Sequence, residues 1–558
     1  MHKNMRQALA NALEGAGITV PPEEIPLEHT ADFSHGDYAS SVALAYAKEL
    51  GTNPRTLAEK LVVSMGEVEG VSKIEIAGPG FINFTLSSEF IFEMLDIGRA
   101  HGAKWGSGIL LEGEEVLLEY TSPNLFKPLH IGNLVGNVIG ESLSRLFEFA
   151  GAAVRRINYP SDIGLTVAKG VWGLQKTGGD PKDIRALGEA YRAGSDAYEN
   201  DSLAKDEIDA VNKKLYEGSD SALNKLREAG KKTSKKHLDD ICRRLGTTFD
   251  TEIFESETGP VGKKIVEAHI DTVFEKSDGA IVFMGEKRGL HTRVFLNSMG
   301  LPTYEAKDLG NFELKRKEYP KFSRSFVVTG VEQQEYFKVI IAAIREVFPE
   351  EASKTIGHIA TGFLSLTTGK MSSRKGNVLT GEDLLADLGA EAKIRAAESR
   401  SDDIEALADD IAVAALKFQI LKGGTSKDIV FDHARALSLE GDSGPYLQYT
   451  HARTHAILEK AKAAGIEGKF DATQQASELA RLVYRFHETI LRAQEELEPH
   501  HVANYLITVA AAFNSWYAQE QILDSTPAAA HKVALTDITR LTLKNGLWLL
   551  GIPAPEKV

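Results

Sequence analysis

Cysteine is almost absent from this chain of 558 residues, because Cys242 is the only one. A single cysteine cannot form an internal disulfide framework or a zinc site built from several thiolates. No apolar run approaches the roughly 18–20 residues needed to cross a bilayer, and Asn11 and Glu14 interrupt the apolar stretch near the N-terminus. We therefore expect a cytoplasmic protein that has no zinc and does not enter a membrane.

Basic residues are also too few to balance the acidic ones. The chain has 64 Lys and Arg against 79 Asp and Glu, which gives a formal net charge of −15. By itself this charge argues against a nucleic-acid partner, because such partners are held by neutralising phosphates. Net charge does not say where the charges lie, and a large acidic protein can still carry a local basic stripe. The length suggests three to four domains.

One stretch combines a strand, a polar turn and a helix in that order. Val116–Leu118 form a short apolar strand, the turn contains Ser122, Pro123 and Asn124, and a helical pattern starts near Leu134. Free backbone N–H groups and the helix dipole at such a turn favour an anion. Phosphate is the expected ligand.

The residues of the sequence HIGN, at 130–133, fit that use. Gly132 lets a ligand approach the backbone, and Gly136 and Gly140 would let the helix pack tightly on the sheet. His130 supplies a compact donor at the turn. An ordinary turn with a core histidine remains the alternative, since short motif matches are often accidental.

A second stretch, TTGKMSSRKGN, follows a predicted strand at about 359–366. It crowds Lys370, Arg374 and Lys375 among two glycines and two serines. A glycine-flanked loop with three cations suits closure over a triphosphate and neutralisation of charge in the transition state. Taken alone, it could equally be a solvated basic loop.

Together the two stretches resemble the paired signatures of class I aminoacyl-tRNA synthetases. HIGN resembles the first signature, and KMSSR at 370–374 resembles the second. The longer segments EYTSPNLFKPLHIGN and GDSGPYLQYTHARTHAILEKA, the latter at 441–461, are similar to arginyl-tRNA synthetases in particular. The resemblance covers nearly the whole chain and is weakest at 180–255 and 400–430.

The resemblance implies a fold of three parts around a Rossmann-type α/β catalytic domain. Residues 1–105 would form a small α+β domain that contacts tRNA, and residues 106–395 the catalytic domain, with a helical insertion at about 180–255. Residues 396–558 would form an all-α anticodon-binding bundle. The residues themselves support these parts, because strand and helix patterns alternate in the middle and helical periodicity dominates the end.

The implied reaction joins L-arginine to its tRNA through an arginyl-adenylate, with ATP converted to AMP and pyrophosphate. The resemblance places the ATP site at His130, Gly132, Asn133, Gly136, Lys370, Met371 and Ser372. His130, Asn133 and Lys370 would act on the phosphates. This chain has Asn133 and Ser373 where the family commonly has histidine and lysine. Lys375 or Lys127 would supply the missing cation.

A site that binds arginine needs hydrogen-bond acceptors, because a guanidinium presents five N–H donors in one plane. Glu119 ends the strand before the first signature, and Tyr304 and Asp308 share a helix face at i and i+4. The resemblance assigns arginine binding to Glu119, Ser122, Asn124, Tyr304, Asp308 and Gln333, with Gln334 beside them. Surface carboxylates and a helix-capping pair are the alternative interpretation.

The expected partners are therefore tRNA(Arg), L-arginine and ATP with Mg²⁺, bound by a monomer that has no resident cofactor. Two other functions stay open at this point. One is a class I synthetase with another amino-acid specificity. The other is a tRNA-binding homologue with impaired catalysis, which the changes at Asn133 and Ser373 leave possible.

Overall fold

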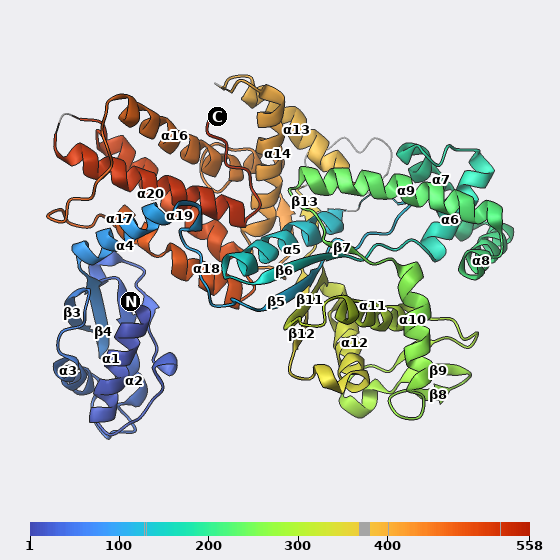
Figure 1. The fold of residues 1–558 in the computed structure, drawn as a ribbon, viewed down its shortest axis with the longest axis horizontal. Coiled ribbons are helices and arrows are strands. Elements are labelled where there is room, and N and C mark those ends of the chain that lie inside the picture. Colours follow the sequence, from blue (N-terminus) through green and yellow to red (C-terminus); the bar gives the residue numbers. More distant parts are fainter. Residues whose placement is uncertain (128, 130, 368–379, 400, 525) are drawn as a thin grey trace. The chain divides into compact units, whose positions relative to one another are not determined.

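The computed structural model describes all residues of the chain except 128, 130, 368–379, 400 and 525 (Figure 1). It contains two compact units. The first consists of residues 1–106, 453–488 and 508–545, and the second of residues 107–452, 489–507 and 546–558. No helix in the described part of the chain is long and apolar enough to span a membrane.

The N-terminal part of the first unit is a four-stranded antiparallel sheet with helices. The strand order is β1-β2-β4-β3. Its elements are α1 (His2–Gly15), η1 (Pro22–Glu24), β1 (Glu28–His29), η2 (Phe33–His35), β2 (Tyr38–Ser40), α2 (Val42–Tyr46), α3 (Pro54–Met65), β3 (Val71–Ala77), β4 (Phe81–Leu86), α4 (Ser88–His101) and η3 (Gly102–Lys104). Met5, Leu9 and Leu13 recur every four residues on α1 and are buried, so hydrophobic periodicity explains this helix.

The C-terminal part of the chain is helical, as the sequence predicts. Its helices are α16 (Gly444–Ala463), α17 (Glu478–Tyr484), α18 (Phe486–Glu495), α19 (His500–Gln519) and α20 (Ala528–Leu549). The apolar stripe of Leu479, Leu482, Val483, Phe486 and Ile490 is buried. It lies on two helices and not on one, because the regular helix is interrupted at Arg485.

The second unit is built on a five-stranded sheet whose strands all run parallel. The strands are β5 (Glu115–Glu119), β6 (Ala153–Asn158), β7 (Thr251–Glu252), β11 (Arg324–Gly330) and β12 (Thr355–Thr361), in the order β12-β11-β5-β6-β7. Val116, Leu117 and Leu118 are buried in succession, which is typical of a central parallel strand covered on both faces. The strand order reverses beside β5, so a ligand crevice is expected at the carboxyl ends of β5 and β11.

Helices cover both faces of this sheet (Figure 1). They are α5 (Ile131–Phe149), α10 (Glu255–Ala268), α11 (Tyr304–Glu318) and α12 (Gln334–Val347), with η5 (Val331–Gln333) and η6 (Pro349–Glu351) around the last one. Successive strand residues point to opposite faces. Accordingly, Tyr120 packs toward α5, whereas Leu117 and Glu119 face α11 and α12.

The remaining elements of the second unit branch from this framework. The segment predicted as a helical insertion contains α7 (Ile184–Asn200), α8 (Ser202–Glu217) and α9 (Ser221–Arg244), which join α6 (Leu165–Thr177). The other elements are β8 (Glu275–Ser277), β9 (Ala280–Phe283), η4 (Gly285–Arg288), β10 (Arg293–Leu296), β13 (Leu364–Leu366), α13 (Gly381–Ala396), α14 (Ile404–Leu421), β14 (Ile429–Phe431) and α15 (His433–Ala436). Phe126, from the turn after β5, is buried among α6, α7 and α9 and so links the insertion to the sheet.

Candidate functional site

The loop after β5 has an unusual backbone for a segment without glycine. Thr121, Ser122 and Phe126 have φ angles of 74°, 37° and 66°. Each such residue costs on the order of 1 kcal/mol, and strain of this kind gathers at functional sites. The Ser122 hydroxyl is buried, and no described residue hydrogen-bonds to it. The loop that the sequence places beside phosphate and arginine is therefore held in a costly conformation.

The N-terminus of α5 is tied to this loop by two asparagines. Asn133 Nδ2 donates to the Thr121 carbonyl at 2.9 Å, and Asn137 Nδ2 donates to Thr121 Oγ1 at 3.0 Å. Gly132 is exposed in the first turn of the helix. This first turn of α5 lies where the sequence predicts an anion site. His130 lies outside the described residues.

The two glycines of α5 differ in what they allow. A Cβ on Gly140 would lie 2.3 Å from Tyr120 Cγ, so the helix can approach the sheet only because this residue is glycine. A Cβ on Gly136 would find its nearest neighbours at 3.9 and 4.0 Å, which is ordinary contact. The packing prediction is confirmed for Gly140 and wrong for Gly136, where a methyl group fits.

Lys370, Met371, Ser372 and Lys375, the predicted residues of the second signature, lie outside the described residues. The helix that follows them is described, and it begins against the first signature. Gly381 N, at the start of α13, donates to the Leu129 carbonyl at 3.0 Å. A Cβ on Gly381 would lie 2.6 Å from Leu134 Cδ1 of α5. The chain after the second signature thus returns to the site of the first.

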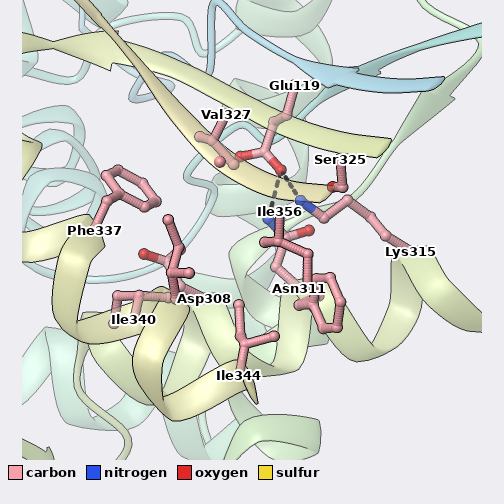
Figure 2. A pocket seen from close by; sticks show the side chains of 13 residues that line it. Glu119, Asp308, Asn311, Lys315, Ser325, Val327, Phe337, Ile340, Ile344 and Ile356 are labelled. Carbon is pink, nitrogen blue, oxygen red and sulfur yellow. Dashed lines mark hydrogen bonds and ion pairs between the residues drawn. The ribbon is translucent and has the colours of Figure 1, made fainter. Parts of the chain in front are cut away.

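The predicted acidic pair meets on the other side of β5. Glu119, at the end of the strand, and Asp308, on α11, line one small cavity (Figure 2). Tyr336 of α12 donates its hydroxyl to Asp308 Oδ2 at 2.5 Å. Burial, opposed in part by this hydrogen bond, raises the pKa of Asp308 to about 7. The slot therefore has one carboxyl group that titrates near neutral pH.

The other predicted arginine-binding residues lie in the same unit and are more open. Tyr304 begins α11 with 63% of its surface exposed, and Lys307 Nζ lies 4.9 Å from its ring centroid. Asn124 is exposed and forms a β-bridge with Ser161 after β6. Gln333 and Gln334 are exposed at the junction of η5 and α12. These positions surround the carboxyl ends of β5, β6 and β11 without lining the cavity.

Lys127 and the lysines of the insertion have partners within the protein. Lys127 Nζ lies 5.9 Å from the ring centroid of Tyr191, on α7. Lys231 pairs with buried Asp162 at 2.7 Å, and Lys235 pairs with Asp239 and Glu252. Of these lysines, the sequence predicts Lys127 as a possible phosphate cation. In the structure these three ion pairs are made by lysines of α9, one of them within the helix and two with neighbouring segments.

Two residues that the sequence analysis missed complete the slot. Asn311 Nδ2 and Lys315 Nζ both donate to Glu119 Oε2, at 2.8 and 2.7 Å. With Tyr304 and Asp308 they form one polar stripe along α11 at i, i+4, i+7 and i+11. That spacing is readable in the sequence, and a polar stripe on a helix that also carries buried apolar residues could have identified them.

Metal ligands are not gathered at this site. Within the described ranges, no group of three or more His, Cys, Asp or Glu side chains is arranged to hold a metal ion. The described site consists of the N-terminus of α5 and, across β5, a slot lined by two carboxyl groups.

Comparison with known proteins identifies the family. Residues 102–433 match the model of the class I tRNA synthetase (R) catalytic domain, residues 447–558 match the DALR anticodon binding domain, and residues 3–86 match the arginyl tRNA synthetase N terminal domain. The arginine–tRNA ligase of Clostridium perfringens is 31% identical over 94% of both chains. That of Archaeoglobus fulgidus is 30% identical over 94% of this chain and 95% of its own.

A solved structure gives the same result for the whole chain. Thermus thermophilus arginyl-tRNA synthetase superposes with a TM-score of 0.81 at 26% identity, covering 100% of both chains. The Plasmodium falciparum enzyme, at 20% identity, shares the fold with a TM-score of 0.80. With its catalytic-domain model spanning more than half its length, the chain belongs to the arginyl-tRNA synthetases of class I.

Proposed function

We propose that this protein joins L-arginine to tRNA(Arg) in two steps. The arginine carboxylate attacks the α-phosphate of ATP, which gives arginyl-adenylate and releases pyrophosphate. A terminal ribose hydroxyl of the tRNA then takes the arginyl group and releases AMP. The observation that carries this proposal is the acidic slot of Glu119 and Asp308 at the strand end that leads into the anion site of α5.

Positioning and electrostatics supply most of the rate in such a reaction. His130, Gly132 and Asn133 would bind the nucleotide at the N-terminus of α5, with Gly136 one turn further along the helix. Lys370 would neutralise the departing pyrophosphate, and Met371 and Ser372 would complete the ATP site. Lys375 or Lys127 would provide the second cation. Mg²⁺ would enter bound to the ATP phosphates, which are its usual ligands in nucleotide sites.

Selection of arginine follows from the acceptors in the slot. A guanidinium can donate to two carboxylates at once, whereas lysine offers a single ammonium group and citrulline carries no charge. A wrong ligand would leave buried acceptors unpaired, and sites built on hydrogen bonds discriminate strongly for this reason. Tyr304 would stack on the guanidinium plane, and Ser122, Asn124 and Gln333 would orient the rest of the amino acid.

The remaining parts of the chain would hold the tRNA. Residues 1–105 would contact its outer corner, and residues 396–558 would contact its anticodon, with the catalytic domain at 106–395 between them in the sequence. We propose that the protein acts as a monomer in the cytoplasm.

Pyrophosphate exchange tests the proposal directly. The purified protein, with tRNA present, should exchange labelled pyrophosphate into ATP when arginine is added. Lysine, citrulline, glutamate and cysteine should support no exchange above background. Exchange with another amino acid but not with arginine would remove the proposed specificity, and exchange with none would remove the proposed reaction.

A variant of the second signature tests the assigned chemistry. Lys370→Ala should lower exchange by about 100-fold or more, because it removes charge stabilisation at the leaving pyrophosphate. Its affinity for tRNA, measured by filter binding, should stay close to that of the parent protein. Unchanged exchange would show that this loop does not act on the phosphates.

A further inference from the structure

The two oxygens of Glu119 are used differently. Oε2 accepts from both Asn311 and Lys315, whereas no described residue donates to Oε1 (Figure 2). Glu119, Asn311 and Lys315 are each only 3% exposed. A buried carboxylate held on one oxygen by two donors has a fixed orientation, and its other oxygen remains free for a ligand.

The orientation of the Asn311 amide follows from this contact. A carboxylate only accepts hydrogen bonds, so the amide nitrogen must face Glu119. The amide oxygen is then buried and has no hydrogen-bond partner in the described part of the chain. Buried polar atoms without partners are uncommon in native proteins and call for an explanation. Here the explanation is that the amide is turned to serve Glu119.

Charge is the second reason to connect Lys315 with Glu119. Around the slot lie Asp308 on α11, Tyr336 on α12, Tyr159 directly after β6 and Glu255 on α10, and none of these four is a cation. Phe337, Ile340 and Ile344 of α12 are apolar. Lys307 pairs with Glu255 at 2.8 Å, whereas Lys315 donates to Glu119 at 2.7 Å. Among the residues that line the cavity, Lys315 is the one cation.

We propose that Lys315 and Asn311 are positioning residues that hold Glu119 with its second oxygen directed at the arginine guanidinium, and that the charge of Lys315 offsets the charges of the slot carboxylates. The proposal rests on the function proposed above and names what tunes its specificity. Without Lys315, Glu119 and Asp308 would share a buried site with no cation beside them, and Asp308 would keep its proton to a higher pH than it does in the parent protein. A protonated carboxyl donates where the guanidinium needs an acceptor, so arginine would have to displace that proton.

The pH dependence of arginine binding distinguishes this role from simple loss of packing. In Lys315→Met, the pH below which the KM for arginine rises should move up by about one unit or more, which raises the KM at pH 7 by about fivefold or more. Lys315→Arg should restore the parent profile. Asn311→Leu should raise the KM for arginine severalfold, and the KM for ATP should stay within about twofold in all three variants.

Lys417→Met provides the matched control. Lys417 is another fully buried lysine of the same unit, on α14, but it donates to the Leu245 and Gly551 carbonyls and to no carboxylate. Its loss should leave the pH profile of the arginine KM in place. Thermal melts of every variant would show that each is folded.

Two results would overturn the proposal. One is an unchanged pH profile in folded Lys315→Met. The other is a lower KM for arginine at every pH, which is expected if Lys315 merely repels the guanidinium. If the parent protein charges no arginine at all, the proposed function fails before the variants are compared, so the two failures are distinguishable.

Discussion

Asp308 combines a position in the proposed arginine slot with an unfavourable environment. Burial raises the pKa of this carboxyl to about 7, against an ordinary value near 4, and the hydrogen bond from Tyr336 offsets the effect only partly. An acid in this state is half protonated near neutral pH. The same side chain can therefore control both arginine binding and the stability of the free protein.

The first prediction concerns binding. A guanidinium needs the ionised carboxylate, so the KM for arginine should be level above about pH 8. It should rise as the pH falls through 7, approaching tenfold per unit well below that value. Asp308→Asn should raise the KM at pH 8 and flatten the profile. Steady-state aminoacylation from pH 6 to pH 8.5 checks this, with the KM for ATP as the control.

The second prediction concerns stability, which should depend on pH in the opposite direction to arginine binding. The pKa of Asp308 is higher in the folded than in the unfolded protein. Its contribution to the free energy of unfolding is therefore most favourable below about pH 4 and is lost as the pH rises through 7. Asp308→Asn should therefore be more stable than the parent at pH 8, by about 2–4 kcal/mol at most. Urea unfolding at pH 8 and pH 5.5 measures the difference. A variant that is equally destabilised at both pH values would contradict it.

At the scale of elements, α5 is fitted to the sheet by one glycine. Gly140→Ala should lower the free energy of unfolding by about 1–3 kcal/mol, because the new methyl group overlaps the Tyr120 ring. Gly136→Ala is the matched control one turn earlier. There the methyl group fits, and the gain in helix propensity should leave stability level or raise it by about 1 kcal/mol. Thermal melts of the ligand-free proteins compare the two.

The sequence predicts those elements whose pattern is local. The buried run in β5 and the i, i+4 pair of Tyr304 and Asp308 on α11 can be recognised without any knowledge of the fold. Lys315 could not be assigned to Glu119, because that contact depends on how α11 lies against the sheet. The positive φ angles of Thr121 and Ser122 were equally hidden, since neither residue type signals such a backbone.

At the scale of the whole molecule, the last residues of the chain are built into the second unit. Ser142 Oγ of α5 donates to the Leu549 carbonyl at 2.9 Å, and Arg145 Nη1 donates to the Trp548 carbonyl at 2.8 Å. Lys417 Nζ joins the Leu245 carbonyl after α9 to the Gly551 carbonyl, at 2.6 and 2.8 Å. One buried amine thus connects three segments that are distant in the sequence, which no local pattern could predict.

The protonation of the Lys417 amine should make the stability of the second unit depend on pH. Burial lowers the pKa of Lys417 to about 7, and a neutral amine still has two N–H groups for its two carbonyls. Between pH 7 and about 10 the unfolded chain holds this proton and the folded chain does not, so stability should rise with pH. The free energy of unfolding of the parent, minus that of Lys417→Met, should increase by about 1 kcal/mol per pH unit from pH 7 to pH 9, measured by urea unfolding. A difference between the two proteins that stays constant over this range would mean that Lys417 keeps its charge in the folded state.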